Sequence, residues 1–165
     1  MRGFPIIFIL FVVALPLEAK VEEPFLLSIS GGVFNLIKDK KSANFQIECR
    51  SNFSLYREHK FFIRPVFGYM RALNSSSYLY GGLAFDLMPS PHIVISPSFS
   101  PGVYMKGQGM DLGYALEFKT TLEIAYRFNN RSRIGVMFYH LSNANIGKKN
   151  PGTECLMLVY SIPIF

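Results

Sequence analysis

Alternation of apolar and polar side chains is the feature that most constrains this chain, and it is clearest in residues 116–127. Apolar residues fill most even positions there, whereas Glu117, Lys119 and Glu123 occupy odd positions. Successive side chains of a β-strand point to opposite faces of the sheet. A period of two does not fit a helix, so this run predicts a strand with one apolar face and one charged face.

Seven further runs of similar character make up most of the chain, and none of them favours a helix. The predicted strands cover residues 25–37, 45–55, 61–73, 78–88, 93–104, 116–127, 131–142 and 154–165. Runs of this length match the roughly 9–11 residues of a tilted transmembrane strand. Pro97 and Pro101 predict a bulged or edge-like fifth strand, because proline donates no ladder hydrogen bond.

The N-terminal segment differs from the rest of the chain. Arg2 precedes an apolar stretch at residues 4–15, and Ala19 ends a segment suited to signal-peptidase cleavage. The apolar stretch is shorter than the ~20 residues that a spanning helix needs, although an uncleaved membrane anchor is the alternative. We therefore expect a signal peptide at residues 1–19 and one β-barrel domain at residues 20–165.

An exported chain of eight long strands has two common architectures. A soluble lipocalin-like barrel turns its apolar faces inward, whereas an outer-membrane barrel turns them toward lipid and must close, because lipid tolerates no unpaired edge. Charged residues in the middle of run 116–127 suit a polar lumen, and a terminal Phe165 after a β-run is typical of bacterial outer-membrane barrels. We predict an all-β fold, an eight-stranded antiparallel transmembrane barrel in the bacterial outer membrane.

Aromatic residues near the predicted strand ends also favour the membrane barrel, since such barrels carry aromatic girdles at both interfaces. The residues expected in these girdles are Tyr56, Phe61, Phe62, Tyr78, Tyr80, Tyr104, Phe128 and Tyr139.

Charge, cysteine and histidine content indicate which molecules the protein can bind and whether a disulfide or a metal site is expected. The formal net charge of +6 is spread along the chain and is compatible with anionic lipid or nucleic acid. With a membrane barrel as the fold, we expect lipid and no nucleic acid. Cys49 and Cys155 fall on strands not expected to be neighbours, so buried free thiols are favoured over a disulfide. His59 and His92 have no partners at metal-ligand spacing, so no metal site is expected.

The segment between residues 139 and 154 carries the candidate chemistry. His140 and Ser142 are two residues apart, so an extended backbone places both on one face. Glu154 follows the turn at residues 150–152 and returns beside them on the last strand. A serine nucleophile needs an adjacent base, and a carboxylate can orient the histidine that serves as that base. Each residue also has a non-catalytic interpretation. His140 can be a histidine at the membrane interface, Ser142 can satisfy a backbone group with its hydroxyl, and Glu154 can be a solvated charge.

The topology predicts where this segment lies. With both termini in the periplasm, the loop at residues 143–153 is extracellular and Asn129-Asn130 forms a short periplasmic turn. His140 and Ser142 are in phase with an aliphatic face that should contact lipid. Glu154 belongs to the corresponding phase of the last strand, although a lipid-facing Phe165 would favour the opposite phase there. A β-bulge near the hairpin would reconcile the two.

Two short motifs add a family resemblance. They are His140-x-Ser142-Asn143-Ala144 and Asn150-Pro151-Gly152-x-Glu154. Together they resemble the signature of the PagL-type lipid A 3-O-deacylases, which are eight-stranded outer-membrane barrels. The resemblance implies a catalytic triad of Ser142, His140 and Glu154 on the lipid side of the barrel. It also implies an ester hydrolase that removes the 3-hydroxyacyl chain at the 3-position of lipid A and needs no cofactor.

One position departs from the family pattern. The family usually has glycine after Ser-Asn-Ala, where a backbone amide helps to form the oxyanion hole, and this chain has Asn145. Asparagine tolerates the left-handed region better than most residues. The resemblance leaves Asn143, Asn145 and Asn150 as candidate oxyanion donors.

Other features bear on substrate and assembly. Lys148 and Lys149 are candidates for binding the lipid A headgroup, because phosphates at that depth attract cations; a solvated loop is the alternative. Two other functions remain open, a non-catalytic barrel of the structural or adhesin type and a soluble lipocalin-like binder. Whether the protein forms a homodimer is also open.

Overall fold

Every regular element in the described part of the chain is a β-strand. The computed structural model describes residues 23–37 and 41–164, so the expected signal peptide at 1–19 and Phe165 lie outside it. No helix among these residues has the length and hydrophobicity needed to cross a membrane. The strands are β1 (Phe25–Phe34), β2 (Ser42–Arg50), β3 (Tyr56–Glu58), β4 (Phe61–Ala72), β5 (Ser77–Ser90), β6 (Ile93–Met105), β7 (Leu116–Arg127), β8 (Arg133–Ser142) and β9 (Thr153–Ile164).

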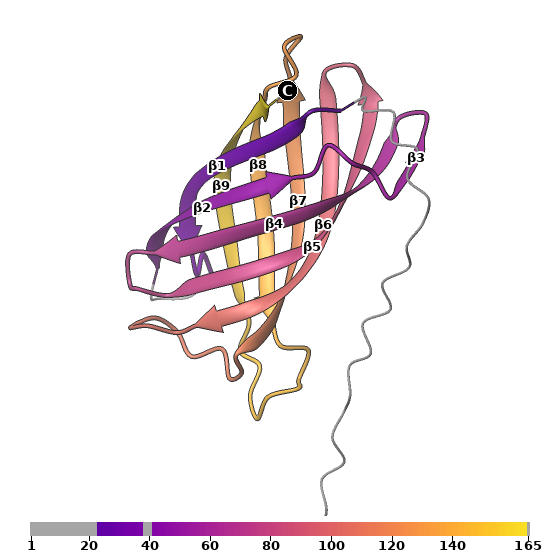
Figure 1. The fold of residues 1–165 in the computed structure, drawn as a ribbon. Helices are drawn as coiled ribbons and strands as arrows, with labels where there is room; N and C mark the ends of the chain where they lie inside the picture. The colour runs from indigo at the N-terminus through magenta and orange to yellow at the C-terminus, as the bar shows by residue number, and fades with distance from the viewer. Residues whose placement is uncertain (1–22, 38–40, 165) are drawn as a thin grey trace, which may run out of the picture.

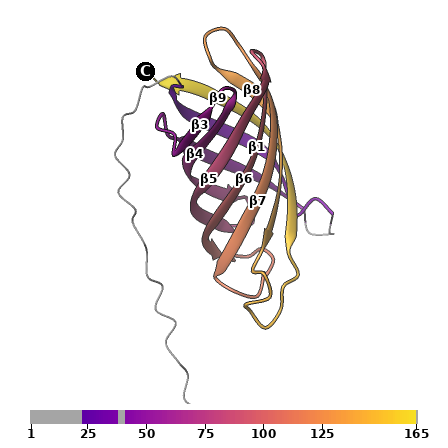
Figure 2. The ribbon, with the colours of Figure 1, turned by 90° about the vertical axis from the view of Figure 1, so that its right-hand side faces the viewer.

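Antiparallel pairing closes these strands into a barrel (Figures 1 and 2). The sheet runs in the order β2-β1-β9-β8-β7-β6-β5-β4-β3, and an additional β2–β4 pairing joins its ends. The short β3 pairs only with the beginning of β4, whereas β2 pairs with the rest of β4. Eight long strands therefore form the ring, which confirms the predicted eight-stranded barrel. The predicted run at 45–55 is divided between β2 and the segment leading into β3.

Strand β6 is neither bulged nor an edge, so the prediction made from its two prolines was wrong; the extra residue lies on β5. Its register with β7 is continuous from Ile93 to Val103. Pairing with β5 is interrupted and shifts between Leu87 and Ser90. The prediction of an edge-like strand was wrong because barrel closure gives β6 a partner on each side.

The outer surface of the barrel is apolar and its inner surface is largely polar. In β7 the buried residues are Glu117, Lys119, Thr121, Glu123 and Ala125. Exposed residues of the outer wall include Ile29, Phe45, Ile47, Phe67, Leu79, Phe99, Leu122, Ile124, Val136, Phe138 and Leu158. This is the reverse of a lipocalin, and an apolar exterior on a closed barrel is what contact with lipid acyl chains requires.

Five of the eight aromatic residues expected in interfacial girdles are instead inside the barrel. The buried ones are Phe62, Tyr78, Tyr80, Tyr104 and Tyr139. The prediction was wrong for these residues because they belong to the inward phase of their strands. Tyr78 and Tyr80 stack with ring centroids 5.3 Å apart. Tyr56 and Phe128 are exposed as expected.

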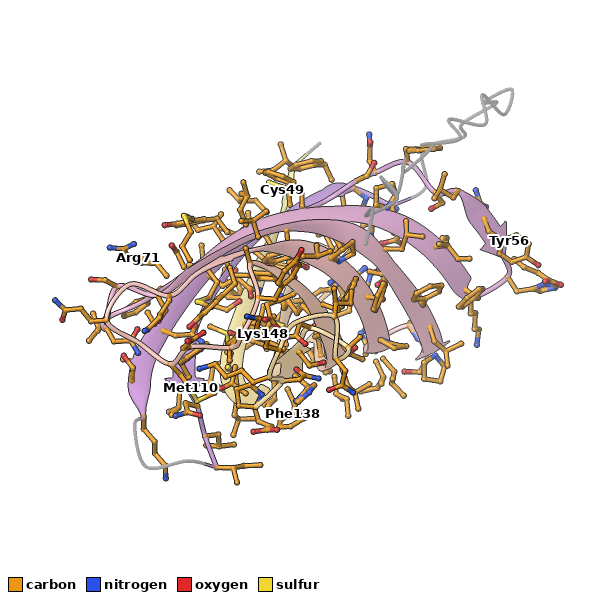
Figure 3. The ribbon with its side chains drawn as sticks, turned by 90° about the horizontal axis from the view of Figure 1, so that it is seen from below. Cys49, Tyr56, Arg71, Met110, Phe138 and Lys148 are labelled. Carbon is orange, nitrogen blue, oxygen red and sulfur yellow. The ribbon has the colours of Figure 1, made fainter. Side chains whose placement is uncertain are left out.

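The two cysteines are free thiols. Cys49 lies on β2 and Cys155 on β9, and β1 separates these strands, so the predicted absence of a disulfide is confirmed. Cys155 is buried, whereas Cys49 is partly exposed on the outer wall (Figure 3). The expectation of a buried Cys49 was wrong, because the residue shares the outward phase of Phe45 and Ile47.

One half of the lumen is held together by a carboxylate with three arginine partners. Asp86 on β5 lies 2.7 Å from Arg50, 3.2 Å from Arg64 and 3.1 Å from Arg133. Ser96 donates a further hydrogen bond of 2.7 Å to Asp86. These partners come from β2, β4, β6 and β8, so a single buried side chain links strands from all around the barrel.

The other half of the lumen combines aromatic, methionine and aliphatic side chains around one ammonium group. Lys119 Nζ donates to Gln46 Oε1 at 2.8 Å and lies 3.6 Å from Glu48 Oε2. It also lies 4.0 Å from the centroid of the Tyr80 ring and 4.9 Å from that of Tyr139. A buried ammonium is costly unless it is compensated, and these contacts provide that compensation.

The connections divide the barrel into two ends, visible as the bottom and top of Figure 1. We call the end with the β4–β5, β6–β7 and β8–β9 connections the loop end, and the opposite end, where β9 finishes, the termini end. The turn at Asn129-Asn130 joins β7 to β8 at the termini end. The longer connection at residues 143–152 joins β8 to β9 at the loop end.

We predict that Asp86→Asn lowers the free energy of unfolding by about 3–5 kcal/mol, because an amide removes one carboxylate partner from each of three buried arginines. The measurement is urea unfolding of the refolded barrel in detergent micelles. Asp111→Asn, in an exposed loop, is the matched control and should unfold like the parent. Equal unfolding midpoints for the parent and Asp86→Asn would contradict the role assigned to Asp86.

Candidate active site

Direct pairing across β8 and β9 brings the predicted histidine and glutamate together. His140 is opposite Glu154 in the register, and His140 Nδ1 lies 3.1 Å from Glu154 Oε1. The carboxylate can only accept, so this contact is a hydrogen bond when Nδ1 carries the proton. That tautomer leaves Nε2 as a free base.

Both side chains lie on the outer wall of the barrel. Residues of the same phase on β8, such as Val136 and Phe138, are exposed, and Figure 3 shows Phe138 pointing away from the barrel. The β8–β9 register is continuous from Arg133 to Leu141, so no bulge reverses the phase between the strands. The lipid-facing phase predicted for His140 and Glu154 is thus the one observed.

Ser142 follows on the same face, two residues beyond His140, and is half-buried. Same-face neighbours on a strand are ~6.6–7 Å apart along the backbone. Within the described chain, Ser142 and His140 make no hydrogen bond with each other. Catalytic hydrogen bonds are commonly long in unliganded enzymes and shorten when substrate binds. The structure therefore places Ser142 and His140 on one face of β8 without a hydrogen bond between them.

In the sequence Gly152 belongs to a predicted turn and to the second family motif, and in the structure it packs directly against the histidine. Its backbone has a φ of +60°, and a Cβ at this position would lie 2.8 Å from Cε1 and 3.2 Å from Nε2 of His140. The turn therefore forms one wall of the imidazole site. The signal in the sequence was the glycine two residues before the glutamate.

The sequence also provided no indication of the aromatic residue on the strand next to Ser142. Phe118 on β7 pairs with Ser142, and its ring stacks on that of Phe99 with centroids 5.8 Å apart. Thr120 pairs with His140 on the side opposite Glu154. No pattern within a single strand reveals these neighbours, because they depend on the register between strands.

The residues after Ser142 form a tight turn. Ala144 and Asn145 have φ values of 52° and 63°, and the Ile146 amide donates to the Asn143 carbonyl at 3.0 Å. Two consecutive positive φ values with this hydrogen bond define a type I′ turn. Asn145 therefore adopts the left-handed conformation that glycine would adopt, which it tolerates better than most residues.

Asn143 points into the barrel and fastens two loops together. Its Nδ2 donates to the carbonyls of Leu112 at 2.8 Å and Lys149 at 2.9 Å. Its backbone amide donates to Asn150 Oδ1 at 3.0 Å. Both donor groups of Asn143 are therefore engaged within the loops, and the Asn150 carbonyl oxygen is an acceptor here. Asn145 lies on the exposed turn, and no described residue accepts a hydrogen bond from its backbone amide.

The two candidate lysines differ in their surroundings. Lys149 Nζ lies 2.8 Å from Asp111 Oδ2 in the β6–β7 loop, and both groups are solvent-exposed. The hydrogen bond from Lys149, together with one from the Gly113 amide, lowers the pKa of Asp111. Lys148 is exposed on the same loop. No group of three histidine, cysteine or acidic residues in the described chain could hold a metal ion.

Comparisons with known proteins agree with this fold and show the family. The family model described as lipid A 3-O-deacylase (PagL) matches residues 52–163. A crystal structure of the outer membrane enzyme PagL aligns with a TM-score of 0.68 at 19% identity, covering 84% of this chain and 99% of that one. A designed transmembrane β-barrel aligns with a TM-score of 0.53 at 11% identity, over 84% and 95% of the two chains. No curated protein matches the chain in sequence.

We predict that Asn143→Ala loosens the loop at residues 143–152, because the carbonyls of Leu112 and Lys149 lose their donor. A lost hydrogen bond that leaves buried acceptors unpaired costs about 1–3 kcal/mol, so exchange of the Ile146 amide should accelerate about tenfold or more. Hydrogen–deuterium exchange of the folded barrel measures this. Asn129→Ala, at the termini end, should leave that rate unchanged; equal rates in both variants would show that Asn143 does not hold the loop.

Proposed function

This chain belongs to the PagL family of lipid A 3-O-deacylases, which are carboxylic ester hydrolases of the outer membrane, and we propose that it hydrolyses the 3-hydroxyacyl ester at the 3-position of lipid A through Ser142, His140 and Glu154. The observation that carries the mechanism is the 3.1 Å contact between His140 Nδ1 and Glu154 Oε1 on the outer wall. Ser142 lies on the same face of the same strand.

The reaction follows the usual steps of a serine esterase. Ser142 Oγ attacks the ester carbonyl carbon while His140 Nε2 takes its proton, and Glu154 stabilises the imidazolium. The tetrahedral intermediate collapses to an acyl-serine, and the sugar oxygen leaves with the proton from His140. Water, deprotonated by His140, then attacks the acyl-serine and releases the hydroxy fatty acid.

The oxyanion of the tetrahedral intermediate needs hydrogen-bond donors close to Ser142. We assign this role to the backbone amide of Asn145, because it lies on an exposed type I′ turn three residues after Ser142 and donates to no described residue. Asn143 and Asn150 support this turn through their mutual 3.0 Å hydrogen bond. The substitution of asparagine for the family glycine preserves the positive φ of 63° on which this arrangement depends.

The position of the site suits a membrane-embedded ester. His140, Ser142 and Glu154 lie near the loop end of a lipid-facing wall, which is the extracellular end in the family topology. A lipid A molecule in the outer leaflet reaches them by lateral diffusion and need not enter the lumen. Lys148 on the adjoining loop supplies a cation for the phosphorylated headgroup, whereas Lys149 is already paired with Asp111.

We predict that cells expressing the parent protein carry lipid A that has lost one hydroxyacyl mass, and that Ser142→Ala abolishes the loss, because removing a nucleophile costs several orders of magnitude in rate. Mass spectrometry of lipid A extracted from Gram-negative cells measures this. Ser54→Ala, between β2 and β3, is the matched control and should act like the parent. Unmodified lipid A with a folded parent barrel would instead favour a non-catalytic barrel, and loss with both serine variants would contradict the role of Ser142.

We predict that Gly152→Ala lowers kcat about 100-fold without unfolding the barrel. Its Cβ would lie 2.8 Å from the imidazole Cε1, and a displacement of this order at a catalytic group can cost that factor. Initial rates on purified lipid A and heat-modifiability in gels measure the two effects. Gly31→Ala is the control, because a Cβ there would meet only Phe45 at 3.7 Å. Similar rates for the two variants would show that His140 does not depend on this contact.

A further inference from the structure

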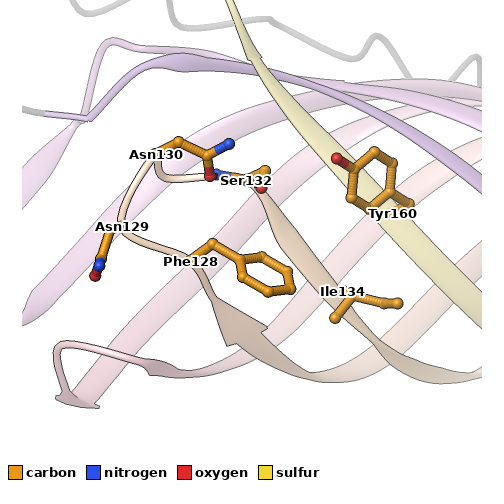
Figure 4. A pocket seen from close by; sticks show the side chains of 6 residues that line it. All are labelled: Phe128, Asn129, Asn130, Ser132, Ile134 and Tyr160. Carbon is orange, nitrogen blue, oxygen red and sulfur yellow. Dashed lines mark hydrogen bonds between the residues drawn. The ribbon is translucent and has the colours of Figure 1, made fainter.

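Two hollows in the outer wall lie away from the active site. The first, of about 500 Å³, lies at the termini end and is shown in Figure 4. It is lined by Phe128, Asn129, Asn130, Ser132, Ile134 and Tyr160. The second, of about 360 Å³, lies farther along the wall between β1, β2, β8 and β9 and shares Ile134 and Tyr160 with the first. The two hollows therefore follow one another along the lipid-facing surface.

Polarity changes along this path. The end at the β7–β8 turn presents two asparagines and a serine, whereas the second hollow is bounded mainly by Ile29, Phe45 and Leu158. Tyr160 lies between the two regions, with its hydroxyl directed toward the turn (Figure 4). A polar end continuous with an apolar channel matches the division of a lipid into headgroup and acyl chain.

The polar end is rigid and presents donors. Asn130 Oδ1 accepts hydrogen bonds from the Ser132 hydroxyl at 2.7 Å and the Ser132 amide at 3.1 Å. The carbonyl oxygen of the Asn130 amide is thereby engaged by Ser132, and its Nδ2 group is the donor that a ligand could meet. The turn is closed by hydrogen bonds of 2.9 Å between Phe128 and Ser132 and between Arg131 and Phe128. Amide N–H donors on a fixed turn suit phosphate or ester oxygens.

Depth in the membrane decides which lipid can fit. Residues 130 and 142 are 12 positions apart, or about 40 Å along a strand and about 30 Å along the membrane normal at a tilt of ~40°. That is the thickness of the hydrocarbon core. The turn therefore lies at the interface opposite the active site. The leaflet assignment rests on the proposed function; the hollows themselves do not.

We infer that this surface binds one glycerophospholipid of the inner leaflet, with its phosphate at Asn129 and Asn130 and one acyl chain along Ile134 and Tyr160 into the second hollow. The acyl chain of a lipid A substrate is the competing occupant. It would enter from the active-site end and bring its methyl end toward the asparagines. Burying unpaired amides against a methyl group is unfavourable, whereas a lipid from the inner leaflet satisfies them.

The test is native mass spectrometry of the refolded barrel in detergent micelles containing phosphatidylethanolamine. The parent should retain one phospholipid per barrel and should not retain diacylglycerol, which has the same chains without the phosphate. Asn129→Asp should lower the retained fraction about tenfold, because a carboxylate repels the phosphate and a charge-assisted hydrogen bond is lost. Ile134→Trp should do the same by filling the hollow.

Ile124→Trp is the matched control, since Ile124 is 52% exposed on the same wall and lines neither hollow. It should retain phospholipid like the parent. Lipid A deacylation measured on the same samples should be unchanged by Asn129→Asp, so that failure of the proposed function shows separately. Equal phospholipid retention in all four proteins would overturn the inference. Preferential retention of lipid A or of free fatty acid over phosphatidylethanolamine would also overturn it and assign the hollows to the substrate.

Discussion

Closure of the hydrogen-bonded sheet by the β2–β4 pairing is the constraint on which the rest of this structure depends. In lipid, unpaired backbone groups cost several kcal/mol each, so an open sheet edge is not tolerated. Closure gives β6 two partners despite Pro97 and Pro101. It also gives each strand an inner and an outer face, and the alternation of the sequence then decides which side chains contact lipid.

Closure also confines the polar side chains, and they neutralise one another. Asp86 balances arginines from β2, β4 and β8, and Lys119 is held by Gln46, Glu48 and two tyrosine rings. The buried lumen side chains are thus committed to holding the barrel together. In the proposed mechanism the chemistry takes place on the outer wall, where the substrate of a lipid A deacylase resides.

The candidate site depends on neighbouring strands and loops more than on local sequence. The β8–β9 register sets His140 against Glu154, and Gly152 packs against the imidazole. Asn143, which follows the serine, joins the β6–β7 and β8–β9 loops from inside the barrel. The turn at Asn145 keeps a glycine-like conformation with a different residue, so the departure from the family pattern leaves the backbone in place.

The sequence by itself determined the strand count, the apolar outer face, the absence of a disulfide and the three candidate catalytic residues. Each of these follows from a period of two or from short motifs, which are local properties of the chain. Only the tertiary structure decided that Asn143 is engaged within the loops and that Gly152 contacts His140. These facts depend on register and loop packing, which bring together residues far apart in the sequence, and no single run of residues encodes them.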